Sequence, residues 1–195
     1  LNFVLARNPI VVMVNPVNDW ATEMSADELA LALTTAETWS DVNSSWPAVP
    51  IERIFPGTDS FPYRQVSRLL FAEDADALAN ASDAQFSEDD NVLVSDVANS
   101  EGAISFVSHS GFVEAQGVTA VSIGGLTPGS DGYLFDQPII LLTLDRVLQA
   151  NPDMAAFVNF ALTDGRLALF DLGLALPDES TQQANEQAWL DAVGE

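Results

Sequence analysis

The chain has 195 residues, of which 48% are hydrophobic, so it can form one domain or two small lobes around a hydrophobic core. It carries 29 acidic residues against six basic ones, all arginine; the net charge of −23 excludes nucleic acid and anionic membranes as partners, because both require a basic surface. It contains no cysteine, which excludes disulfides and thiolate metal sites. Electrostatic repulsion between equally negative copies of the chain favours a monomer.

The N-terminal part of the chain predicts one strand, one helix and one loop. β-Branched and aliphatic residues at 10–14 are typical of a strand. Ser25 and Glu28 stand at the spacing of a capping box and are followed by helix-forming residues, so a helix is expected to begin after Ser25. The polar stretch that follows, with Trp39 and Trp46, is expected to be a loop.

The middle of the chain is predicted to alternate strands with helices. Apolar and charged residues alternate at 51–55, which indicates a strand, and the Pro-Gly-Thr-Asp-Ser turn after it leads into a helix. The expected strands lie at 51–55, 102–107 and 118–123, and the expected helices lie at 62–71 and 90–98.

The C-terminal part is predicted to be mostly helical. Pro152 suits the first turn of a helix, and Met154, Phe157 and Val158 follow at helical spacing. An apolar run interrupted by Pro138 indicates a strand. The expected elements are a strand at 134–144, helices at 152–163 and 179–193, and a helix or strand at 166–174. Helices and strands alternate along the whole chain, which favours an α/β architecture.

Eight segments, which together extend over about residues 10 to 175, carry a resemblance to one known family. They are the stretches 11–16 (VVMVNP), 24–29 (MSADEL), 38–43 (TWSDVN), 56–60 (PGTDS), 101–107 (EGAISFV), 118–123, 133–142 and 154–163. In this order they resemble the phosphate-type solute-binding proteins of ABC transporters, which have the type II periplasmic-binding fold. One departure is Gln137, which stands where the family carries an arginine.

The resemblance implies an α/β protein with one near-complete lobe and the C-terminal part of a second lobe. The central lobe is expected over 12–111, and residues 1–11 and 112–195 are expected to supply hinge strands and the partial first lobe. Nothing in the chain corresponds to the family's first ligand loop. The implied protein is extracytoplasmic, is not an enzyme and needs no cofactor. It would bind phosphate or a similar oxyanion in the cleft between its lobes and act with an ABC transporter permease.

The turn at 56–60 and the helix after it hold the candidate ligand-binding residues. A helix N-terminus offers free N–H groups and a positive dipole end, hydroxyl groups donate hydrogen bonds, and arginine binds oxyanions in a bidentate manner. Phe61 and Pro62 replace the family's Gly-Thr pair, which adds bulk and removes one N–H donor. The candidates are Thr58, Asp59, Ser60 and Arg64.

Other interpretations of these residues remain open at this stage. Ser60 could simply cap the helix, with Arg64 and Arg68 on a solvated face. The chain could then be an extracellular sensing or interaction module that is derived from the family and no longer binds phosphate. Hydrolysis at His109, the only histidine, is the weakest alternative, because no strand–turn–helix elbow surrounds it and no metal-ligand spacing accompanies it.

Overall fold

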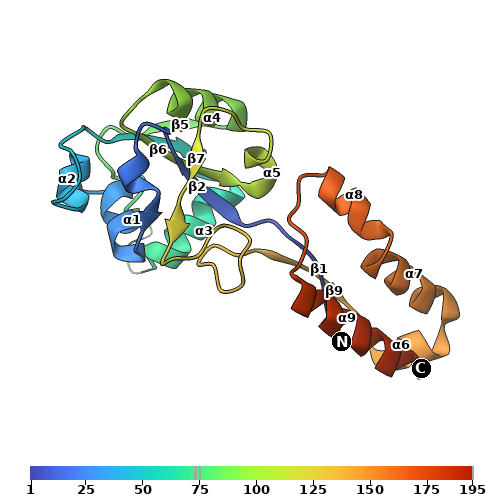
Figure 1. Cartoon of the computed structure of the whole chain (residues 1–195). Helices are drawn as coiled ribbons and strands as arrows, with labels where there is room; N and C mark the ends of the chain where they lie inside the picture. The colour runs from blue at the N-terminus through green and yellow to red at the C-terminus, as the bar shows by residue number, and fades with distance from the viewer. Residues whose placement is uncertain (73, 75, 195) are drawn as a thin grey trace. The chain divides into compact units, whose positions relative to one another are not determined.

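The computed structural model describes residues 1–72, 74 and 76–194, and it shows two compact units (Figure 1). The larger unit comprises Ile10–Phe135, and the smaller unit comprises Leu1–Pro9 together with Asp136–Glu195. The lobe bounds proposed from the sequence differ from these units at residues 10–11 and 112–135, which lie in the larger unit. Each unit is described by itself below.

The larger unit is built on a mixed five-stranded sheet with the order β5-β4-β6-β2-β7. Strand β4 is parallel to both β5 and β6, whereas β2 is antiparallel to β6, with Ile10 opposite Ser108 and Val14 opposite Ile104. All five residues of β2 are buried, as expected for a strand covered on both faces. The strands are β2 (Ile10–Val14), β4 (Glu52–Pro56), β5 (Gln85–Ser87), β6 (Ala103–Ser108) and β7 (Thr119–Ala120).

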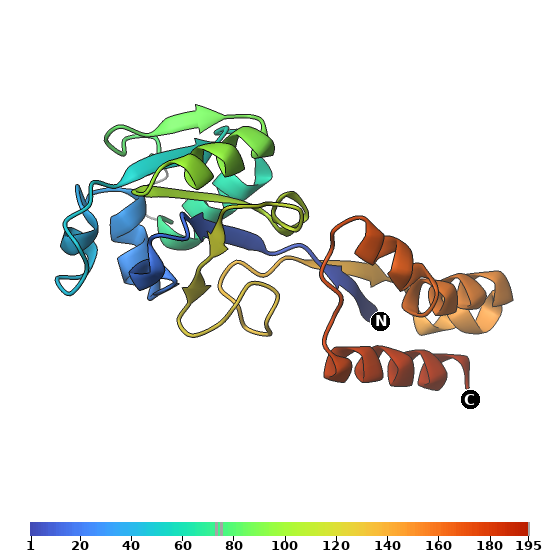
Figure 2. The same ribbon diagram turned by 45° about the horizontal axis from the view of Figure 1, so that its top comes forward.

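Helices pack against both faces of this sheet (Figures 1 and 2). On one face, Leu29, Trp39 and Val66 from the first three helices share a core with Phe106. On the other face, the fourth helix packs against Met13 and its neighbours. The helices are α1 (Ala26–Leu33), α2 (Trp39–Val42), α3 (Phe61–Leu70), α4 (Asp90–Asn99) and α5 (His109–Phe112), with a 3₁₀ turn at Asp19–Ala21. A parallel pair, β3 (Glu23–Met24) and β8 (Ser122–Ile123), completes the unit.

The smaller unit pairs β1 (Asn2–Arg7) antiparallel with β9 (Pro138–Leu142) and adds four helices. Its core is formed by Phe3, Leu148, Val158 and Ala192. Both views show α9 running beside the β1–β9 pair (Figures 1 and 2). The helices are α6 (Asp145–Ala150), α7 (Pro152–Leu162), α8 (Gly165–Asp171) and α9 (Glu179–Val193).

Most sequence-predicted elements are confirmed, and three are corrected. The segment at 166–174, for which helix and strand were both predicted, contains the helix α8. The first correction is that the expected strand at 118–123 is split into β7 and β8. Trp39 does not lie in a loop: it begins the one-turn helix α2 and is fully buried. Pro138 begins β9 rather than interrupting a strand, and it lies opposite Arg7 at the end of the ladder, where its missing N–H costs little.

Candidate functional site

The predicted ligand-binding residues lie where β4 turns into α3. The turn is closed by two backbone hydrogen bonds, from the N–H of Gly57 to the carbonyl of Ser87 at 3.0 Å and from the N–H of Ser60 to the carbonyl of Gly57 at 2.9 Å. Ser60 is the N-cap of α3, and its hydroxyl oxygen accepts from the N–H of Tyr63 at 3.2 Å. Pro62 lies in the first turn, where a helix needs no N–H donor from it.

A groove of about 420 Å³ runs along one side of α3, and it brings two of the four predicted residues together. Thr58 and Arg64 line it, whereas Asp59 and Ser60 do not. Asp59 contacts the groove residue Arg64 through its backbone: the Arg64 guanidinium donates a hydrogen bond to the Asp59 carbonyl oxygen at 2.5 Å. The groove is lined by Thr58, Tyr63, Arg64, Ser67, Arg68, Phe71 and Ala72.

Arg68 is a member of this groove that the ligand-loop pattern did not identify. It lies one helical turn after Arg64, and both residues line the same hollow. Its Nε donates to the side-chain oxygen of Gln65 at 2.8 Å, which fixes its orientation. The four-residue spacing of Arg64 and Arg68 in the sequence could have identified Arg68, because residues four apart lie on the same side of a helix. Two of the chain's six cationic side chains therefore lie in one groove.

Tyr63 lines the same groove but offers it only the ring. The residue is 5% exposed, and its hydroxyl oxygen is buried without a hydrogen-bond partner among the described residues. Burial raises the pKa of the Tyr63 phenol, and the nearby Asp76 raises it further, so the hydroxyl group stays neutral. In this conformation the hydroxyl group has no exposed surface with which to contact a ligand. Tyr63 therefore shapes the groove.

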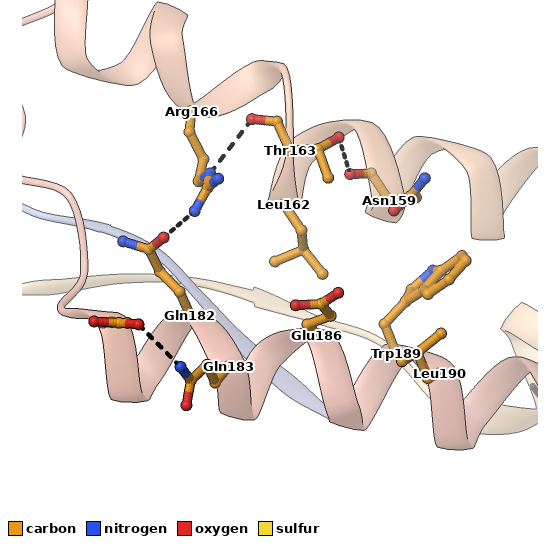
Figure 3. A pocket seen from close by; sticks show the side chains of 10 residues that line it. Asn159, Leu162, Thr163, Arg166, Gln182, Gln183, Glu186, Trp189 and Leu190 are labelled. Carbon is orange, nitrogen blue, oxygen red and sulfur yellow. Dashed lines mark hydrogen bonds between the residues drawn. The ribbon is translucent and has the colours of Figure 1, made fainter.

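A second hollow, of about 380 Å³, lies in the smaller unit between α7 and α9 (Figure 3). Leu162 points into it from α7, and Glu186 and Trp189 rise toward it from α9. Arg166 is engaged there by the side-chain oxygen of Gln182 and by the carbonyl of Thr163. The carboxylates of Glu179 and Glu186, two residues that line this hollow, repel anions, so it suits an oxyanion less well than the groove along α3.

Two further observations concern metals and membranes. In residues 1–72, 74 and 76–194, no three histidine, cysteine, aspartate or glutamate side chains gather in a way that could hold a metal ion. Within the same described residues, no helix is both long and apolar enough to cross a membrane. His109 lies at the start of α5, beside Ser108 and Ser110, whose hydroxyl oxygens are 3.1 Å apart.

A mixed sheet covered by helices on both faces, together with a second unit formed by the two ends of the chain, agrees with the type II periplasmic-binding fold that the resemblance implies. The chain belongs to the PBP superfamily, because the family model described as "PBP superfamily domain" matches residues 1–164. The fold class and the family resemblance predicted from the sequence are thereby confirmed.

Individual relatives are similar over nearly the whole chain. The phosphate-binding protein PstS of Staphylococcus aureus is 25% identical over 93% of this chain, and the match spans 58% of that relative's length. A crystal structure of a possible phosphate binding protein from Planctomyces limnophilus has a TM-score of 0.73 and 25% identity, covering 99% of this chain and 72% of that one. PstS from Borrelia burgdorferi has the same TM-score at 16% identity, with coverage of 91% and 72%. This last match shows the fold alone.

Proposed function

We propose that the chain is the greater part of an extracytoplasmic solute-binding component of an ABC transporter, and that its ligand is phosphate or a similar oxyanion. It would be a receptor that delivers its ligand to a permease and carries out no reaction. The observation that carries the proposal is the groove in which Thr58 lies with two arginines, in a chain whose net charge is −23. The names of the relatives support the ligand class.

The chemistry of the groove fits an oxyanion held by hydrogen-bond donors. The guanidinium groups of Arg64 and Arg68 are charged donors, and the Thr58 hydroxyl group adds a neutral one. Ser60 does not line the groove, but it caps the adjacent end of α3 through its oxygen, which leaves its hydroxyl hydrogen available to a ligand there. The carboxylate of Asp59 would accept from a protonated oxyanion such as hydrogen phosphate and would repel a fully ionised one.

The lobe arrangement that accompanies this function is also a proposal. Residues 12–111 would form the central lobe, and residues 1–11 and 112–195 would form hinge strands and part of the other lobe. Ligand-binding proteins with two lobes close by a hinge, which is the motion that a permease could recognise. Spin labels on the two units would report such closure as a distance change on addition of phosphate.

Equilibrium dialysis with inorganic phosphate tests the site directly. Arg64→Ala in the full-length gene product should weaken binding about tenfold or more, because it removes a charge-assisted donor. Arg146→Ala is the matched control: it removes the same charge from the exposed surface of α6 and should leave binding unchanged. Equal affinity of the Arg64→Ala and Arg146→Ala variants would reject the groove as the site.

A second candidate function is an interaction or sensing module that does not bind phosphate. Phe61 favours it, because this large apolar side chain is exposed at the first residue of α3, where an anion would approach. Replacement of Phe61 by glycine distinguishes the candidates. Stronger phosphate binding in Phe61→Gly is expected if Phe61 only crowds a working site, and absence of phosphate binding in both proteins supports the module.

A further inference from the structure

The turn between β4 and α3 has a second carboxylate beside it, in addition to that of Asp59. Glu88 directly follows β5, and β5 runs parallel to β4, so the two strands end at the same edge of the sheet, where this turn lies. In open α/β sheets, ligands bind outside the carboxyl ends of parallel strands. A Cβ atom placed on Gly57 would collide with the Glu88 carboxylate, so this carboxylate lies directly against the Gly57 backbone.

The space that Glu88 occupies accounts for the glycine at position 57. Gly57 is buried and its φ is not positive, so the backbone conformation itself would accept residues other than glycine. Any side chain there would displace the Glu88 carboxylate. The packing therefore places a carboxylate against the turn that the ligand would approach, although Glu88 itself remains exposed to solvent.

The charges around the groove are not paired with one another. In the described part of the chain, Arg64 and Arg68 form no ion pair, and their guanidinium groups donate to an uncharged carbonyl and to the amide of Gln65. The carboxylates of Asp59 and Glu88 likewise have no cationic partner within the described residues. Unpaired groups of both signs beside one groove favour a ligand that carries both signs of charge.

Aromatic rings lie close to the same carboxylate. Phe86 lies two residues before Glu88, and residues two apart in an extended segment point to the same face. The Phe86 ring is 6.3 Å from the ring of Tyr63, which lines the groove, yet Phe86 remains 44% exposed. Phe61, the first residue of α3, is 47% exposed. The face of an aromatic ring attracts alkylammonium groups, and a carboxylate nearby attracts them as well.

We propose that the ligand of the α3 groove is a zwitterion, namely an organic phosphate or phosphonate whose chain ends in an alkylammonium group. This inference rests on the proposed function, in which Thr58 and the two groove arginines hold the oxyanion. The carboxylates of Glu88 and Asp59, together with the Phe86 ring, would hold the ammonium group. Inorganic phosphate would occupy only the cationic part of this site.

Size and charge both favour such a ligand over inorganic phosphate. The groove volume of about 420 Å³ is within the range of pockets that hold small organic molecules. Two carboxylates beside the groove repel an inorganic anion, whereas an ammonium group on the same ligand would be attracted to them. The net charge of −23 acts in the same direction, because a ligand with a smaller negative charge is repelled less by the chain as a whole.

Calorimetric titration of the full-length gene product with phosphocholine and with 3,3-dimethylbutyl phosphate tests the inference. The two esters have the same shape and the same phosphate group, but the second has a carbon atom in place of the quaternary nitrogen and so lacks the positive charge. Phosphocholine should bind about tenfold more tightly than this analogue. Inorganic phosphate, titrated in parallel, reports on the oxyanion site by itself.

Three variants test the residues. Glu88→Gln should reduce the preference for phosphocholine about fivefold and should strengthen the binding of inorganic phosphate, because it removes a negative charge beside both ligands. Glu52→Gln is the matched control, since it removes the same charge from an exposed residue at the opposite end of β4. Phe86→Leu keeps an apolar side chain but loses the aromatic face, and should lower the preference about threefold.

The possible results separate this inference from the proposed function. Binding of inorganic phosphate together with equal affinity for the two esters, or with no binding of either ester, would overturn the inference and leave the phosphate receptor intact. Absence of binding of all three probes in folded protein would overturn both. A preference for phosphocholine that is the same in Glu88→Gln and Glu52→Gln would reject Glu88 as the group that selects the zwitterion.

Discussion

The hydroxyl oxygen of Ser60 accepts a hydrogen bond from the backbone N–H of Tyr63 at 3.2 Å and closes the first turn of α3. This bond occupies an acceptor site of the hydroxyl group and leaves its hydrogen available. Capping and anion binding, which are competing interpretations of the sequence, are therefore compatible in one residue. Loss of Ser60 should affect both stability and affinity, and the two effects can be separated by the choice of substitution.

Ser60→Ala should lower the free energy of unfolding by about 1 kcal/mol, because the N–H of Tyr63 loses its acceptor. Ser60→Asp retains a capping oxygen and should keep the stability close to that of the unaltered protein. Its carboxylate should nevertheless weaken phosphate binding by repulsion. Urea denaturation and phosphate titration of both variants check these expectations. Unchanged affinity in Ser60→Asp would show that Ser60 is only a cap.

The capping box of α1 predicts a pH-dependent contribution to stability. The backbone N–H of Ser25 donates to the Glu28 carboxylate at 2.8 Å, and this bond, supported by Asn43, lowers the pKa of Glu28. A lowered pKa in the folded state means that the ionised carboxylate stabilises the fold above the unfolded pKa. The contribution disappears as the pH falls through the folded pKa.

Glu28→Gln should therefore be less stable than the unaltered protein near neutral pH, and the difference should shrink in acid. Thermal unfolding of both proteins from neutral pH down to strongly acidic pH measures it. Glu101→Gln removes the same charge from an exposed position and serves as the control. A difference between Glu28→Gln and the unaltered protein that persists at the acidic end would contradict the assignment.

The ion pair of Arg7 and Asp136 is predicted to stabilise the strands of the smaller unit. The Arg7 guanidinium donates to the Asp136 carboxylate, and the side chains are only 8% and 18% exposed. Asp136→Ala should cost about 2 kcal/mol, because Arg7 loses the carboxylate that accepts its charge-assisted hydrogen bond, while the Asp178 carboxylate still interacts with it. The double variant Arg7→Met with Asp136→Leu should recover much of that loss. A cost for Asp136→Ala below about 1 kcal/mol in urea denaturation would match a solvated surface pair instead.

Sequence patterns predicted those helices whose first residues are determined by a capping residue or a proline close by in the chain. The capping box at Ser25 gave the start of α1, and Pro152 gave the start of α7. The helix at Trp39 was missed because it has only four residues, and burial of the indole ring against the core determines it. Local patterns carry no information about such distant contacts.

The candidate site was predictable only in part, for a similar reason. Thr58 and Arg64 lie in one groove as the loop pattern suggested, but the contribution of Arg68 depends on the surface of α3 as a whole. The exposure of Phe157 was also hidden, since helical spacing identifies an apolar side without showing what covers it. The departure at Phe61 and Pro62 has a structural account, because Ser60 caps α3 and Pro62 lies in its first turn.

Calorimetric titration of the full-length gene product with inorganic phosphate near neutral pH tests the central claim most directly. The account predicts saturable binding of one phosphate per chain, with a dissociation constant that is micromolar or tighter. The net negative charge of the chain repels phosphate, and salt screens this repulsion. Moderate salt should therefore preserve or improve the affinity for phosphate. Absence of a binding signal in correctly folded protein would contradict the claim and favour the interaction module.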